Sequence, residues 1–162
     1  MSFQTRIATY HDYSAIVRLL LEVHNLHHNH RPDVYAEVDI PLTQEHYLAM
    51  LKQEQFQIFV IEESCSHEII GYGSVKFLSL SSLSLLVPTH IAYIDDFCIA
   101  SHFKRQGAGK FLFNTIAQYA KEMGAQSLQL TVWEFNKDAL AFYNTLGMHT
   151  HNRRLELDLK GY

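Results

Sequence analysis

The sequence has few residues of the kinds that build disulfide-linked, fibrous or membrane-spanning proteins. It contains two cysteines, three prolines and seven glycines among 162 residues. Cys65 and Cys98 are too few and too far apart for a disulfide framework, so we expect a reducing, cytoplasmic location. No apolar run reaches the roughly 18 residues that cross a bilayer, and residues 1–12 do not resemble a signal peptide. We therefore expect no membrane association.

Positive charge is also scarce. The formal net charge is −4, which argues against a nucleic-acid-binding protein that works by bulk electrostatics. The composition, 48% hydrophobic and 19% charged residues, is typical of an ordinary globular protein. No linker or repeat divides the chain, and its length suits one core. We expect a single domain over residues 1–162.

Hydrophobic spacing and breaker residues predict the order β-α-α-β-β-β-α-β-α-β. Asp12, Thr43 and Asn136 are the expected N-caps of three helices. This order predicts an α/β (α+β) fold with a mixed sheet and helices on both faces. The strands are expected at 3–10, 57–63, 69–79, 91–99, 127–133 and 148–159, and the helices at 12–28, 43–54, 107–124 and 136–147.

The loop at residues 104–110, KRQGAGK, stands out against the acidic background. Gly107 and Gly109 remove side chains at the start of a helix, where backbone N–H groups and the helix dipole attract anions. Lys104, Arg105 and Lys110 add positive charge around them, which favours a phosphate ligand. A dinucleotide-binding fold is disfavoured because it needs G-x-G-x-x-G after an early strand, and this loop has only G-x-G.

Two segments together resemble a known family. YIDDFCIASHFKRQGAGKFL is similar to the acyl-CoA-binding motif of the GCN5-related N-acetyltransferases (GNAT), and NKDALAFYNTLGM resembles a later motif of that family. The resemblance is close over residues 91–148 and holds in outline for the first 80 residues. It implies a mostly antiparallel central sheet in which two strands splay apart to receive the cofactor.

The resemblance also implies acetyl-CoA as the co-substrate. Its pyrophosphate would be held by backbone N–H groups from Gln106 to Lys110, where Ala108 is small enough to allow the approach. Lys104 departs from the family's usual Gln or Arg; it keeps the charge but loses the bidentate geometry. On the preceding strand, the backbone of Phe97, Cys98 and Ile99 matches the positions that bind the pantetheine arm.

The family's chemistry needs a general acid for the departing thiolate, and Tyr143 matches that position. Asp95 matches a position where some relatives carry a glutamate proposed as the base, and it could instead anchor a cationic amine. Asp96 is the next candidate, and strict alternation would place the two aspartates on opposite faces of the sheet. A backbone N–H of Cys98 or Ile99 could stabilise the oxyanion. Asn136 is expected to cap its helix and to lie near the cofactor.

Two other chemistries are disfavoured. His24, His27, His28 and His30 are spaced to share a helix side, but no cysteine or carboxylate set accompanies them, so we expect solvated histidines and no metal site. Residues 27–35 match a region that lines the family's acceptor pocket. A nucleophilic Cys98 would need a depressed pKa and a base, which a buried strand position rarely provides.

We therefore expect direct transfer of an acetyl group from acetyl-CoA to a primary amine in a ternary complex. The acceptor could be a small molecule or a peptide, and no decisive acceptor signature is present. The alternatives are a non-catalytic acyl-CoA-binding regulatory module and an acetyltransferase for protein N-termini or lysines. No nucleic acid partner is expected, and a homodimer is left open.

Overall fold

The computed structural model of the chain describes residues 2–80, 85 and 87–161. The chain forms two compact units, residues 1–131 and 132–162, and each is described by itself. The second unit contains the helix α4 (Lys137–Thr145). The first contains β1 (Phe3–Ile7), η1 (Tyr10–Asp12), α1 (Tyr13–His30), α2 (Gln44–Met50), β2 (Phe56–Glu63), β3 (Ile69–Leu80), β4 (Thr89–Ile99), η2 (Ser101–Phe103), α3 (Ala108–Glu122) and β5 (Ser127–Gln129).

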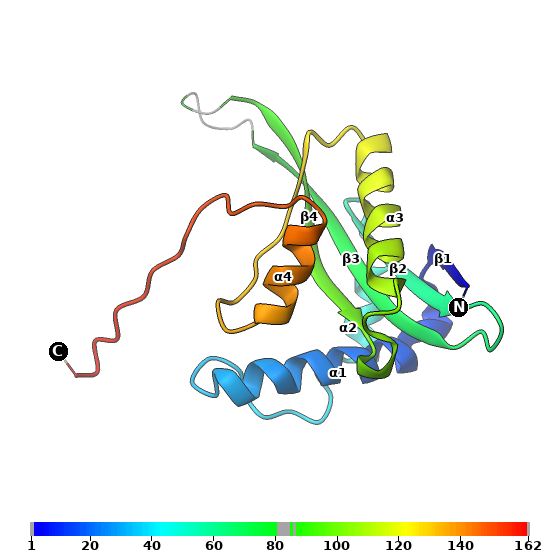
Figure 1. Cartoon of the computed structure of the whole chain (residues 1–162), viewed down its shortest axis with the longest axis horizontal. Helices are drawn as coiled ribbons and strands as arrows, with labels where there is room; N and C mark the ends of the chain where they lie inside the picture. Colours follow the sequence, from blue (N-terminus) through cyan, green and yellow to red (C-terminus); the bar gives the residue numbers. More distant parts are fainter. Residues whose placement is uncertain (1, 81–84, 86, 162) are drawn as a thin grey trace. The chain divides into compact units, whose positions relative to one another are not determined.

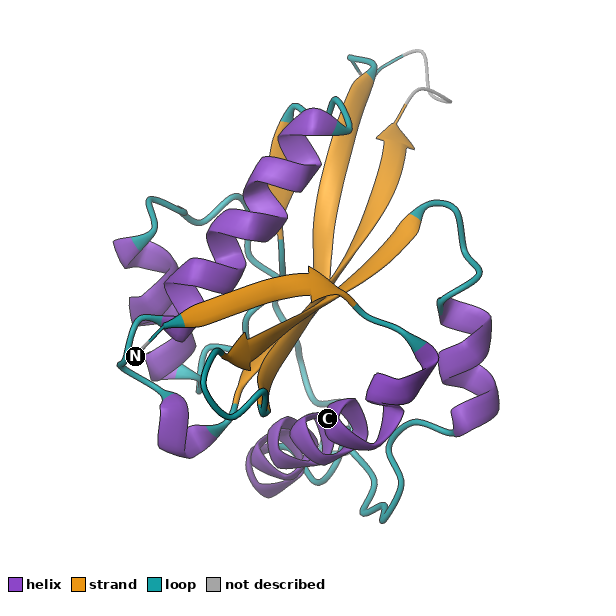
Figure 2. Ribbon diagram, turned by 90° about the vertical axis from the view of Figure 1, so that its right-hand side faces the viewer, coloured by secondary structure: helices purple, strands orange, loops and turns teal. Residues whose placement is uncertain are grey.

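The described strands form one twisted sheet in the order β1-β2-β3-β4-β5 (Figures 1 and 2). The pairs from β1 to β4 are antiparallel, and β5 runs parallel to β4. The parallel pair needs a crossover, which α3 provides. This confirms the mixed, mostly antiparallel sheet expected from the sequence.

One face of the sheet packs against α1 and α2. Ile58 and Val60 of β2 alternate toward this face and join Tyr72 of β3 and Cys98 of β4 in one core cluster. The helices contribute buried residues to the same cluster, which removes their apolar faces from water. These are Ile16 and Leu19 of α1 and Tyr47 of α2.

The opposite face packs against α3. Phe59, the neighbour of Ile58 in β2, points this way and its ring makes an edge contact with Tyr119 of α3 at 5.1 Å between centroids. A side chain at Gly73 of β3 would meet Ile116 of α3, with the added Cβ 2.7 Å from Cδ1. The helix therefore lies close against the sheet, and helices cover both faces as expected.

Gly71 allows β3 and β4 to pack closely. A Cβ at this position would lie 2.5 Å from Cδ1 of Ile99 and 2.6 Å from the backbone oxygen of Cys98. Real Cβ atoms do not approach that closely, and a backbone oxygen cannot rotate away as a side chain can. The absence of a side chain at Gly71 therefore fixes how closely the C-terminal part of β4 lies against β3.

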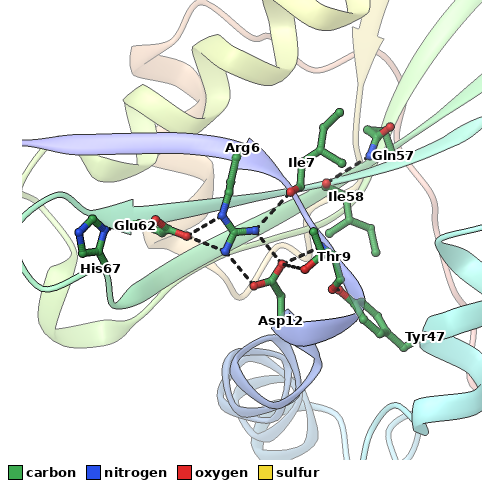
Figure 3. Close-up of polar contacts among 9 residues, drawn as sticks. All are labelled: Arg6, Ile7, Thr9, Asp12, Tyr47, Gln57, Ile58, Glu62 and His67. Carbon is green, nitrogen blue, oxygen red and sulfur yellow. Dashed lines mark hydrogen bonds and ion pairs between the residues drawn. The ribbon is translucent and has the colours of Figure 1, made fainter.

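A polar cluster around Arg6 joins β1, β2 and the start of α1 (Figure 3). The guanidinium donates hydrogen bonds to both carboxylate oxygens of Asp12 at 2.8 and 2.9 Å, and its Nε donates to Glu62 at 2.7 Å. Asp12 also accepts from the backbone N–H of Thr9 at 2.7 Å. Burial alone would raise the pKa of Asp12, but these hydrogen bonds outweigh it and hold the pKa below its usual value.

The caps follow the sequence prediction at two helices and differ at the third. Thr43 accepts a hydrogen bond from the backbone N–H of His46, and Asn136 accepts from that of Ala139. Asp12 precedes α1 as predicted, but its side chain makes no capping bond. The carboxylate turns back toward Arg6 because a buried charge gains more from a bidentate cation than from one N–H.

The predicted last strand is wrong. Residues 148–159 form no strand, and Leu155, Leu157 and Leu159 are 89%, 66% and 69% exposed. Their alternation is that of a strand, but a strand is stable only when a neighbouring backbone accepts and donates its hydrogen bonds. None of the described helices is long and apolar enough to span a bilayer. The single domain over 1–162 stays a prediction.

Candidate active site

A β-bulge interrupts β4 at the acidic pair. Asp96 pairs with Ser74 of β3 and Ile94 pairs with Val75, so Asp95 is an extra residue with no partner in the ladder. The backbone N–H of Asp96 donates to the hydroxyl of Ser74 at 3.1 Å. A bulge of this kind redirects side chains and increases local twist, and such bulges are common beside active sites.

The bulge brings both aspartates to the face that α1 covers. Ser74 and Tyr72 share a face by alternation, and Tyr72 belongs to the α1 core, so Asp96 lies on that face. Lys76 lies on the same face, and its Nζ donates to Oδ1 of Asp95 at 2.6 Å. The expectation that the two aspartates lie on opposite faces is wrong, because the extra residue breaks the alternation on which it rests.

The two carboxylates differ in environment. Asp95 is 41% exposed and paired with Lys76, which is 37% exposed. Asp96 is buried over most of its surface, and its carboxylate accepts no hydrogen bond from any described residue. Burial, together with the charge of Asp95, raises the pKa of Asp96 to about 6, while Lys76 opposes the shift. Asp96 can therefore exchange a proton near neutral pH.

The C-terminal half of β4 has an open edge. Within the described chain, β5 pairs only with Ile91, Ala92 and Tyr93, so no strand covers β4 beyond that point. The backbone N–H of Ala100 bonds to Ile70 on β3, and alternation then directs the backbone groups of Phe97 and Ile99 toward the open edge. Those of Cys98 face β3. This is the splayed strand pair, and its backbone groups face the edge that β5 leaves uncovered among the described residues.

The thiol of Cys98 is placed as a core group. It is buried and its Sγ donates to the backbone oxygen of Leu19 at 3.5 Å. Burial and the nearby charge of Glu22 raise the pKa of Cys98 to about 12. A thiol with so high a pKa has almost no thiolate at neutral pH, and the geometry therefore disfavours covalent catalysis through Cys98.

The basic loop connects η2, which follows β4, to the N-terminus of α3. Arg105 and Gly107 both have positive φ angles, 61° and 93°, so the backbone turns sharply within three residues. A non-glycine residue in this conformation costs about 1–2 kcal/mol, and such strain concentrates at functional sites. Gln106 stabilises the turn, because its amide donates to the backbone oxygen of His102 at 2.9 Å.

The first turn of α3 contains backbone N–H groups that no side chain caps. The helix has no side-chain cap, and the N–H of Phe111 donates to the oxygen of Gly107 at 3.0 Å. The N–H groups of Ala108, Gly109 and Lys110 precede this bond and have no acceptor inside the helix. Gly107 is exposed, and an added Cβ there would meet only a ring carbon of Phe3, at 3.9 Å. The loop is open to an anion.

Two predicted site residues belong to the second unit. Asn136 caps α4 through its side-chain oxygen, 3.1 Å from the N–H of Ala139. Tyr143 is half-buried in the same helix, with its ring centroid 5.1 Å from that of Phe142. Their roles near the cofactor and the thiolate stay predictions.

The histidines near the end of α1 interact with backbone carbonyls. His24 lies 2.7 Å from the oxygen of Ala36, and His28 lies 2.7 Å from that of Tyr35. The ring of His27 stacks on Tyr35 at 5.0 Å. These contacts tie residues 35–36 to α1, and no group of three or more metal-ligating side chains occurs among the described residues.

Sequence reasoning missed Lys76. Nothing in its local sequence distinguishes it from a lysine on a solvated strand face. Its relation to Asp95 depends on the register between β3 and β4 and on the bulge, which local pattern does not reveal. The only local signal is a charged residue in an otherwise apolar strand.

The comparison with protein families decides the classification. The model of the acetyltransferase (GNAT) family matches residues 20–148, which include β4, the basic loop and α4. The chain belongs to this family. A mutant of the BH1408 protein from Bacillus halodurans has the same fold, with a TM-score of 0.93, 28% identity and coverage of 96% of this chain and 99% of that one.

Two further relatives match over a shorter segment or at lower identity. Thialysine N-epsilon-acetyltransferase from Bos taurus is 30% identical over 79 residues, which are 49% of this chain and 44% of that protein. The aligned segment therefore spans less than half of that relative. Glucosamine-6-phosphate N-acetyltransferase from Arabidopsis thaliana has a TM-score of 0.71 at 21% identity, with coverage of 98% of this chain and 100% of that one, and it shares the fold.

Proposed function

We propose that this GNAT protein transfers an acetyl group from acetyl-CoA to a primary amine of a small acceptor by direct attack. One observation carries the proposal: the open edge of β4, the bulged acidic pair and the donor-rich start of α3 follow one another between Tyr93 and Lys110. The first suits an extended arm, the second an amine and the third a phosphate group.

The residues of the loop and of β4 fit coenzyme A. The open first turn of α3 would hold the pyrophosphate through the N–H groups from Gln106 to Lys110, with Lys104 and Arg105 adding charge. The outward backbone groups of Phe97 and Ile99 would bind the pantetheine arm. Of the strand residues predicted to bind it, Cys98 contributes through packing, because its own backbone groups face β3.

The acidic pair supplies two roles. Asp96 suits the general base, because its carboxylate has a pKa of about 6 and no competing hydrogen bond among the described residues. Asp95 suits the amine anchor, since it is exposed and already holds one ammonium group, that of Lys76. The alternative in which Asp95 is the base acting through water remains open to test.

Family membership supports proposals for three further roles. Tyr143 is proposed to protonate the departing thiolate, and Asn136 is proposed to combine its capping role with a place near the cofactor. The N–H of Ile99 is the better candidate of two for the oxyanion contact, because that of Cys98 faces β3.

The acceptor is proposed to be a small amine. The Bos taurus relative is a thialysine N-epsilon-acetyltransferase, and thialysine is an amino acid with a side-chain amine. A protein N-terminus or lysine is the second candidate for this enzyme. The rival from a different class is a regulatory module that binds acetyl-CoA without turnover.

Thiol release separates these possibilities. The purified protein is incubated with acetyl-CoA and a panel of amines that includes thialysine, lysine, diamines and short peptides, and free coenzyme A is followed with a thiol reagent. Release that depends on a small amine supports the proposal, and release with peptides alone supports a protein acceptor. Acetyl-CoA binding by calorimetry, without release in any mixture, would replace the enzyme with a binding module.

A further inference from the structure

Lys76 projects from β3 into the acidic pair of β4. It pairs with Tyr93 in the ladder, and its Nζ lies 2.6 Å from Oδ1 of Asp95 and 5.1 Å from the centroid of the Tyr93 ring. Both members of the ion pair are more than a third exposed. The ammonium group is therefore a fixed, accessible part of the surface beside Asp96.

This lysine changes the charge that an acceptor meets. Without it, Asp95 and Asp96 would form a doubly negative surface suited to an acceptor with two cationic groups. With it, one ammonium group lies beside the two carboxylates and offsets one of their negative charges. An acceptor with a second positive charge would be repelled by Lys76, and an acceptor with a negative charge would be attracted.

The ammonium group also has hydrogen-bonding capacity to spare. A lysine has three N–H donors. One of them donates to Asp95. The ring of Tyr93 attracts the positive charge through its face and is not a carboxylate or carbonyl acceptor. The Lys76 side chain is 37% exposed, so its ammonium group can be reached by an incoming anion, and charge-assisted hydrogen bonds of this kind are the strong ones.

We propose that Lys76 is a specificity-determining residue that selects acceptors carrying a carboxylate in addition to the reacting amine. In this arrangement Lys76 binds the carboxylate of an amino-acid-like acceptor while its distal amine is directed to Asp96. The inference rests on the proposed function and adds the substrate class: amino acids with a side-chain amine, in preference to diamines and polyamines.

Matched acceptors test this directly. Lysine and 1,5-diaminopentane have the same amine and chain and differ only in the carboxylate; thialysine and its decarboxylated diamine form a second such pair. For the wild type, kcat/KM is expected to be at least about 10-fold higher for the carboxylate-bearing member of each pair. In Lys76→Met the ratio should fall to 1 or below, through a higher KM for the amino acid and a lower KM for the diamine.

Three variants control the experiment. Lys76→Arg keeps the charge and should keep the preference for the carboxylated acceptor. Lys76→Gln removes the charge but keeps a polar side chain, so it should lose the preference and replaces Lys76→Met if that variant folds poorly. Lys121→Met removes an exposed charge from the last turn of α3 and should leave the ratio unchanged. A general change in net charge would instead shift the ratio equally in Lys76→Met and Lys121→Met.

The failures are distinguishable. Turnover of diamines that equals or exceeds that of their carboxylated partners, or a ratio unaffected by Lys76→Met and Lys76→Gln, overturns the role of Lys76 and leaves the acetyltransferase activity intact. Activity with peptides or polyamines alone would also overturn the role of Lys76 and leave the acetyltransferase activity intact. The absence of thiol release with every amine overturns the proposed function itself, and the inference with it.

Discussion

The backbone N–H of Asp96 donates to the hydroxyl of Ser74, 3.1 Å away, at the point where β4 has one residue more than β3. Ser74 is fully buried, so no water replaces this contact. The hydroxyl satisfies a donor that a regular ladder would have satisfied with a carbonyl. The backbone at Asp96 is thereby fixed, while its carboxylate accepts no hydrogen bond from any residue that the structure describes.

Asp96→Asn should raise the free energy of unfolding and lower the catalytic rate. The pKa of Asp96 rises to about 6 in the folded state, from an ordinary value near 3.8. Between these values the folded state binds more protons than the unfolded state, so this group's contribution to stability declines as pH rises through that window. At about pH 8 the variant should be more stable by up to about 3 kcal/mol, and near pH 4 the gain should vanish. Denaturant unfolding at both pH values measures this.

The same variant tests the base. If Asp96 removes the proton from the amine, Asp96→Asn should lower kcat by about 10²–10⁴ and remove the acidic limb of the pH–rate profile near pH 6. A kcat equal to that of the wild type would exclude Asp96 as the base.

Asp95→Asn distinguishes the two roles left to that residue. As an amine anchor, Asp95 contributes binding, so the variant should raise the KM of the acceptor several-fold and keep kcat. As a base, it should lower kcat and keep the KM. The exposed pair with Lys76 contributes little to stability, so both variant and wild type should unfold within about 1 kcal/mol of each other.

Gly107→Val should abolish cofactor binding. The position has a φ of 93°, which a β-branched residue adopts only with strain, and its side chain would cover the first turn of α3. Calorimetry with acetyl-CoA is the measurement, with Gly124→Ala at the other end of the helix as the control for a left-handed glycine. Near-native affinity in Gly107→Val would remove the pyrophosphate from this loop.

Tyr143→Phe should lower kcat by about 10²–10⁴ without changing the affinity for acetyl-CoA. The change deletes one hydroxyl and keeps the ring that lies beside Phe142, so α4 should fold as before. Single-turnover kinetics measure the transfer step. An unchanged rate would mean that solvent protonates the thiolate and that the tyrosine serves packing alone.

Arg6→Ala should destabilise the fold, and Arg6 is not among the residues proposed to bind substrates or transfer protons. It leaves the buried carboxylate of Asp12 without its bidentate partner. Removing one member of a buried pair costs about 3–5 kcal/mol, and because Arg6 is 37% exposed we expect a loss at or below the lower end of that range. Because the pKa of Asp12 is depressed, this stabilisation is present above its unfolded pKa and is lost as pH falls through the folded pKa. Unfolding of the single and double Arg6→Ala, Asp12→Asn variants would show the coupling, and additive effects would contradict it.

Local sequence was sufficient for the parts of the fold that depend on neighbours along the chain. The strand–loop–helix from Tyr93 to Glu122 and the caps Thr43 and Asn136 follow from spacing and capping rules, and all of them are present. The family resemblance supplied the antiparallel sheet and its open edge, which spacing alone does not specify.

The features that local sequence did not predict depend on pairing between distant segments. The bulge at Asp95 exists only relative to Ser74 and Val75, and the ion pair with Lys76 exists only because of the bulge. The alternating leucines at 155–159 have the pattern of a strand, but pattern supplies no partner. For the bulge, the missing information is the register between β3 and β4, and for the leucines it is whether a partner strand exists. Both depend on residues that are distant in the sequence.

The close approach at Gly71 has a consequence for distant substitutions. A single methyl group there would act as a wedge between two strands, because it meets the backbone of Cys98 and the end of Ile99. The wedge would push outward the same segment whose opposite edge presents the backbone groups of Phe97 and Ile99. A substitution on β3, on the side of β4 away from its open edge, would thus shift the position of that edge.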